Sequence, residues 1–125
     1  MLNIKNAFSS FAVKDLKKAR QFYGEAVGLP VSETPEGLEI KTPGTTVFIY
    51  PKPQHTAATY TVLNFSVDNV EQAVNELTGR GVKFEIYNDP DIKTDSHGIH
   101  SSGRGPKIAW FKDPDGNILS VLEAM

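Results

Sequence analysis

Two histidines in the last third of the chain have residue types and a spacing that could do chemistry. His97 and His100 lie three positions apart in the segment DSHGIHSS, close to Asp95. Imidazole and carboxylate groups can bind a divalent ion or act as general acid and base. On a helix this spacing would place both rings on one face, but Gly98 and the neighbouring serines predict a loop, where the spacing fixes nothing. We therefore expect solvated or gating histidines, and His97 and His100 are retained as candidate catalytic residues.

The loop that contains these histidines is a candidate binding segment. It runs from Asn88 to Gly105 and is longer than most connections in compact domains. Long loops often act as lids or binding loops. Arg104 is its cationic group and a candidate ligand contact, although an ordinary surface loop is the plainer interpretation.

Glu39 is the third candidate catalytic residue. It alternates with Leu38 and Ile40 in a predicted strand, next to Lys41. A charged pair inside a cavity would suit acid–base chemistry. The solvent-exposed face of a sheet explains the alternation equally well. Both interpretations stay open at the level of sequence.

Composition limits the classes of function. The chain has 125 residues, which fits a single domain, and its net charge of -2 comes without a dense basic block, so we expect no nucleic-acid binding. It contains no cysteine, which excludes disulfides and thiolate chemistry and agrees with a reducing compartment. No apolar run resembles a signal peptide or a membrane span, so we expect a cytoplasmic protein without membrane contact.

Hydrophobic periodicity predicts the same series of elements twice. The first half shows a strand, a helix between an Asp15 cap and Gly28, and three strands, at Asn3–Val13, 16–27, Val31–Glu33, Gly37–Thr42 and Thr45–Tyr50. The second half has a strand, a helix capped by Asp68 or Asn69, and three strands, at Tyr60–Val67, 70–77, Val82–Tyr87, Lys107–Lys112 and Asn117–Leu122. A DPDG turn joins the last two strands.

The two halves correspond at one constant offset. Phe11 matches Phe65, Val13 matches Val67, and the helix stripes follow the same offset. Such repetition is typical of two copies of one unit that cannot bury its sheet face alone. We expect one α+β domain over residues 1–125, with a first module at about 1–52 and a second at about 58–125.

Two segments carry a resemblance to a known family. FAVKDLKKARQFYGEAVGL and IAWFKDPDGNILSVLE, with the weaker FSVDNVEQAVNELTGRGVKF, resemble the vicinal oxygen chelate superfamily, which includes glyoxalase I, bleomycin-resistance proteins and extradiol dioxygenases. The resemblance implies two βαβββ modules with mixed, curled sheets around a cup-shaped cavity, and commonly a homodimer. It also implies a divalent ion, held by His and Glu from the first and last strand of each module, that acts as a Lewis acid.

The implied metal ligands are absent from this sequence. The family's first-strand positions fall at Phe8 and Val62, and its last-strand positions fall at Phe48 and Ser120. Shifting the alignment by one or two residues brings no imidazole or carboxylate to these places. We therefore predict no cofactor and no metal site; a divalent ion would bind only at an atypical site, through the loop histidines.

The resemblance assigns the cup an apolar lining with a few polar groups, which suits an organic ligand. Its predicted ligand-binding residues, with Arg104, are Phe8, Ser10, Phe48, Tyr50, Tyr60, Val62, Asn64, Trp110 and Ser120. Alternatively, Phe8 and Phe48 fill the space of the missing ion and leave a plugged core.

Three functions remain open. The first is a glyoxalase- or bleomycin-resistance-like protein that binds a small organic molecule without a metal. The second is a glyoxalase-related lyase or dioxygenase-like enzyme with an atypical site that uses loop histidines. The third is a dimeric structural or regulatory protein with a degenerate pocket. The sequence does not identify the ligand.

Overall fold

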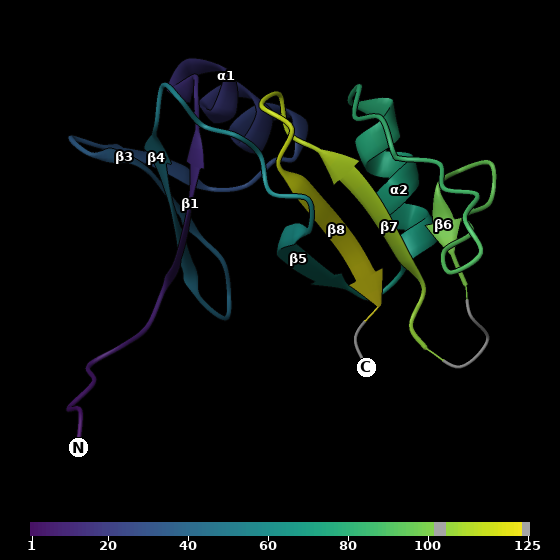
Figure 1. The fold of residues 1–125 in the computed structure, drawn as a ribbon, viewed down its shortest axis with the longest axis horizontal. Helices are drawn as coiled ribbons and strands as arrows, with labels where there is room; N and C mark the ends of the chain where they lie inside the picture. The colour runs from purple at the N-terminus through teal and green to yellow at the C-terminus, as the bar shows by residue number, and fades with distance from the viewer. Residues whose placement is uncertain (102–104, 124–125) are drawn as a thin grey trace. The chain divides into compact units, whose positions relative to one another are not determined.

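The computed structural model describes residues 1–101 and 105–123, and the chain divides into two compact units. Unit 1 is Met1–Thr56 and unit 2 is Ala57–Met125. Each has a four-stranded mixed sheet and its own helix, which confirms the predicted α+β class of two βαβββ modules (Figure 1). Over the described residues, none of the helices combines the length and the apolar character that crossing a bilayer requires.

Unit 1 follows the predicted order closely. Its elements are β1 (Ser9–Val13), α1 (Leu16–Gln21), the π-helical η1 (Phe22–Ala26), β2 (Val31–Thr34), β3 (Gly37–Lys41) and β4 (Thr46–Pro51). The sheet order is β1-β4-β3-β2, with β1 parallel to β4 and the other pairs antiparallel. The Asp15 carboxylate caps α1 by accepting the Lys18 N–H at 3.1 Å. The first strand begins only at Ser9, later than predicted.

The two faces of the unit 1 sheet differ in character. Leu38, Ile40, Val47 and Ile49 are buried on the side of α1 and η1, where Ala19 and Tyr23 are also buried. We call the opposite side the open face. Because strand residues alternate between faces, the register places one row of side chains across the open face: Ser10, Phe48 and Glu39.

Unit 2 repeats the arrangement with one change. Its elements are β5 (Thr61–Val67), α2 (Val70–Gly79), β6 (Ile99–His100), β7 (Ile108–Lys112) and β8 (Ile118–Glu123), in the sheet order β5-β8-β7-β6. The predicted strand Val82–Tyr87 is wrong. Only an isolated bridge between Phe84 and Phe111 forms there, because the chain then leaves β7 for a hairpin in which Tyr87 pairs with Thr94. The edge strand comes instead from the predicted loop.

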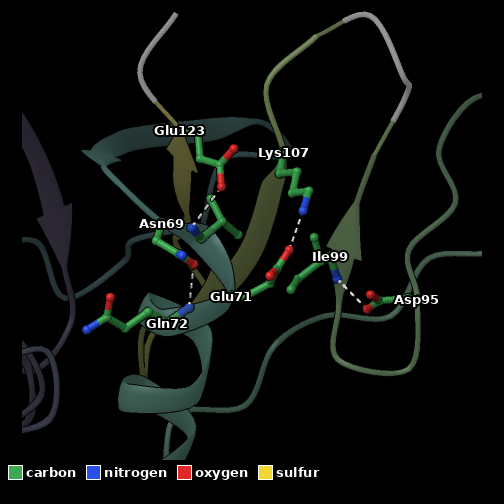
Figure 2. A network of polar contacts seen from close by, with 8 residues as sticks. Asn69, Glu71, Gln72, Asp95, Ile99, Lys107 and Glu123 are labelled. Carbon is green, nitrogen blue, oxygen red and sulfur yellow. Dashed lines mark hydrogen bonds and ion pairs between the residues drawn. The ribbon is translucent and has the colours of Figure 1, made fainter.

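Polar contacts fix the start of α2 to the strands beside it (Figure 2). Asn69 is the cap, because its Oδ1 accepts the Gln72 N–H at 2.9 Å. Glu123 at the end of β8 accepts the Val70 N–H through Oε2 at 3.2 Å. Lys107, just before β7, forms an ion pair with Glu71, and this hydrogen bond raises the pKa of Lys107. The helix is thus connected to both central strands of its sheet.

The DPDG turn sets the register between β7 and β8. Asp113 Oδ1 accepts the N–H groups of Asp115 and Asn117, each at 2.9 Å, and Oδ2 accepts Asn117 Nδ2 at 2.8 Å. Gly116 has a φ of 89°, which favours glycine. In unit 2 we call the side of the sheet away from α2 the open face. The register places one row of side chains across it: Asn64, Ser120 and Trp110.

Candidate functional site

The positions at which the resemblance implied metal ligands do not suit a divalent ion. Phe8 immediately precedes β1, Phe48 lies in the middle of β4, and Val62 sits where the register of β5 shifts. Ser120 is fully buried, and its hydroxyl donates to Asn64 Oδ1. Phenyl and isopropyl groups cannot ligate, and the hydroxyl is already engaged. Within residues 1–101 and 105–123, no three His, Asp or Glu side chains gather in a metal-binding arrangement.

A hollow on the open face of unit 1 joins several of the predicted ligand-binding residues. It has a volume of about 570 Å³ and is lined mainly by Phe8, Phe48, Thr46, Glu39 and Glu36. Phe8 lines this hollow and is 62% exposed. Its volume and mixed lining fall within the range of small-molecule sites.

Two further predicted residues lie on the same open face. Ser10 is exposed and pairs with Phe48 across β1 and β4. Tyr50 is 39% exposed and pairs with Ala12. Glu39 forms an ion pair with Lys41 at 3.6 Å, so its charge is partly compensated at the rim of the hollow. The face therefore combines exposed aromatic rings with a few polar groups.

A larger hollow lies on the helix side of unit 1. It measures about 700 Å³ and lies between α1 and the β2–β3 hairpin. Its lining includes the charged residues Lys17, Arg20, Glu25 and Glu33, and Arg20 forms an ion pair with Glu33 at 3.0 Å. Both partners are more than half exposed, which is typical of a solvated surface groove.

An aromatic cluster occupies the open face of unit 2. The Trp110 ring meets the Tyr87 ring in an edge-to-face contact with 5.6 Å between centroids, and the His100 ring lies 6.2 Å from Trp110. Burial, reinforced by the Glu85 carboxylate, raises the pKa of Tyr87, so its phenol stays neutral at physiological pH. We call Trp110, Tyr87 and His100 the Trp110 cluster. Sequence reasoning did not single out Tyr87.

The structure separates the two candidate histidines. His97 is exposed and lines a small groove of about 200 Å³ along α2, with Val74 and Thr78. His100 belongs to β6 and turns toward Trp110 on the open face. The structure therefore gives no support to a joint metal site or an acid–base pair formed by the two rings.

Two other residues were predicted as ligand contacts. Tyr60 precedes β5 and is 69% exposed. Arg104 lies outside the described residues.

The sequence has a match among known families. The Glyoxalase/Bleomycin resistance protein/Dioxygenase superfamily matches residues 7–121, which is nearly the whole chain. The chain belongs to this superfamily. No curated protein matches this glyoxalase-superfamily chain.

Solved structures share this fold over nearly the whole chain. A member of the superfamily from Sphaerobacter thermophilus is 25% identical, with a TM-score of 0.71 over 97% of this chain and 98% of that one. TnmS3, an antibiotic-binding protein from Streptomyces sp. CB03234, is 24% identical, with a TM-score of 0.68 over 100% of both chains. The fosfomycin-resistance protein FosX from Listeria monocytogenes is 14% identical, with a TM-score of 0.71 over 99% of this chain and 96% of that one.

Proposed function

We propose that this glyoxalase-superfamily protein binds a small aromatic or amphipathic molecule on the open face of unit 1, without a divalent ion at the usual positions. The supporting observation is the hollow bordered by Phe8 and Phe48, where the family pattern implies ion ligands. Covering the exposed Phe8 ring would remove apolar surface from water, which favours an apolar ligand. TnmS3, which has the same fold and binds an antibiotic, supports a binding role.

The residues that line the hollow also support a small aromatic or amphipathic ligand. Phe8 and Phe48 supply ring surfaces, and Thr46 with the Glu39 carboxylate supplies hydrogen-bonding groups at the edge. Aromatic contacts of this kind contribute about 0.5–1.5 kcal/mol beyond simple burial. A ligand of one or two rings fits this combination of surfaces.

A thermal-shift screen of one- and two-ring aromatic molecules, followed by calorimetric titration of the strongest hit, tests the proposal. We expect Phe8→Ala to weaken binding by about tenfold, because it removes one ring surface. The matched control is Ile86→Ala in unit 2, since Ile86 is 60% exposed and Phe8 is 62% exposed. Equal affinities for the two variants, or a screen without any stabilising compound, would refute the proposal.

Metal analysis tests the second half of the proposal. We expect purified protein to carry well below one equivalent of transition metal per chain, and Mn²⁺, Ni²⁺ and Zn²⁺ to leave its melting temperature unchanged. A stoichiometric ion whose binding is abolished by substitution at Phe8, Phe48, Ser120 or their neighbours would contradict it.

We also propose that the protein forms a homodimer, as the family resemblance implies. The exposed apolar side chains of Leu2 and Ile4 support an association surface. Analytical ultracentrifugation checks this, and a monomer throughout the micromolar range would contradict it.

A further inference from the structure

The tautomer of His100 follows from one hydrogen bond. Its Nδ1 lies 2.8 Å from the carbonyl oxygen of Lys93. A carbonyl oxygen can only accept a hydrogen bond, so Nδ1 must carry the proton. In the neutral ring, Nε2 is then left with a lone pair and acts as an acceptor. Among the residues that the structure describes, none donates a hydrogen bond to this nitrogen.

The surroundings of His100 hold the ring in place. β6 pairs with β7, which sets His100 opposite Ile108 and beside the half-buried Trp110. Tyr87 contacts Trp110 as well, and the Glu85 N–H donates to the Trp110 carbonyl at 2.8 Å, which anchors that segment to β7. The acceptor is therefore positioned by backbone pairing next to aromatic surface, and such preorganisation lowers the cost of binding.

Other polar groups on the open face of unit 2 are less suited to recognising a ligand by its hydrogen-bond donor. Ser120 is fully buried, and its hydroxyl already donates to Asn64. The neutral Tyr87 phenol can donate or accept, so by itself it does not discriminate between ligands. In the neutral His100 ring, by contrast, Nε2 can only accept a hydrogen bond. This nitrogen therefore selects ligands that carry a hydrogen-bond donor.

We infer that the Trp110 cluster binds a planar aromatic molecule that carries an O–H or N–H donor, with His100 Nε2 accepting that hydrogen bond while the ligand ring contacts Trp110. This inference goes beyond the proposed function, because the cluster belongs to unit 2 and the hollow proposed above belongs to unit 1. It predicts a preference for phenols and N–H heteroaromatics over their methylated counterparts.

The single tryptophan provides a local reporter for the test. Its indole N–H gives one resonance in a ¹H–¹⁵N spectrum of the full chain, which is titrated with phenol and with anisole. We expect phenol to bind about three- to tenfold more tightly than anisole, the usual gain from one hydrogen bond. In His100→Asn, the amide can still donate to Lys93 but lacks an acceptor at the Nε2 position, so the preference disappears.

The control is His97→Asn, which changes the exposed histidine beside α2 and should keep the preference for phenol. Melting curves of both variants show whether the fold is retained. A third variant, His100→Gln, offers an oxygen near the Nε2 position and should recover part of the preference for phenol. Equal binding of phenol and anisole to the wild type overturns the donor requirement. No shift of the indole resonance, with Phe8-sensitive binding intact, overturns the Trp110 cluster as a site while the proposed function stands. Loss of Phe8-sensitive binding as well refutes both.

Discussion

Substituting Asp113 tests how far one side chain sets the geometry of unit 2. Asp113 is 5% exposed and accepts three hydrogen bonds inside the DPDG turn. Asp113→Ala would leave the backbone N–H and the side-chain amide of Asn117 without this acceptor, and Asn117 is only 1% exposed. Asp113→Asn keeps an oxygen for the two backbone N–H groups and disturbs only the contact with Asn117 Nδ2.

The magnitudes follow from these bonds. A buried donor without an acceptor costs about 1–3 kcal/mol. Because two donors of Asn117 are affected, we expect Asp113→Ala to lower the free energy of unfolding by about 3 kcal/mol. For Asp113→Asn we expect about 1 kcal/mol, since one contact is rearranged and the rest remain.

Urea denaturation followed by far-ultraviolet circular dichroism measures both values. The control is Asp91→Ala, which removes an exposed carboxylate from the same unit and should change stability by less than about 0.5 kcal/mol. The Trp110 indole resonance reports separately whether the register opposite Ser120 is kept. If Asp113→Ala is as stable as Asp91→Ala, the turn does not fix the hairpin and our account of the motif is wrong.

Two other predictions concern stability. Gly37→Ala would place a Cβ 2.1 Å from the Ile49 carbonyl oxygen. We therefore expect urea denaturation to show a free energy of unfolding lower by about 3 kcal/mol or more. Gly44→Ala, which has open space around it, should be nearly neutral and is the control. The N–H of Ile99 holds the pKa of Asp95 below its ordinary value, so this carboxylate stabilises the fold above about pH 4 and the contribution is lost as pH falls through the lowered pKa. Asp95→Asn should therefore lower the melting temperature at pH 6 and have less effect at pH 3; an equal effect at both would refute the charge argument.

Local signals predicted most of the fold. Asp15 was recognisable as a cap, and the second cap was predicted as Asp68 or Asn69, because a short polar side chain preceded an apolar helical stripe. In the structure Asp15 and Asn69 cap the two helices. The DPDG turn was recognisable from Pro and Gly in the order that a tight reversal needs. Alternation in Gly37–Lys41 indicated which residues would be buried, and Leu38 and Ile40 are.

Local sequence patterns did not predict which of two distant segments pairs with a given strand. Val82–Tyr87 alternates like a strand, yet Ile99–His100 takes the edge of the sheet, and no short window of sequence decides between two segments that compete for one edge. The contact of Tyr87 with Trp110 was missed for the same reason. The positions of Phe8 and Phe48 could be carried over from the family, but the hollow that both line in unit 1 became visible only in the structure.

The two copies of the βαβββ unit agree on the helix side and differ on the open face. Compared position by position, the open-face rows Ser10–Phe48–Glu39 and Asn64–Ser120–Trp110 carry different residue types. Side chains on the helix side form the core, whereas the open face is where we propose ligand binding. Substitutions on the open face can therefore change binding with little effect on the packing of the core. Because the fold consists of two copies of one unit, each copy can acquire its own ligand specificity. A few substitutions on the open face can change the chemistry while the fold is kept.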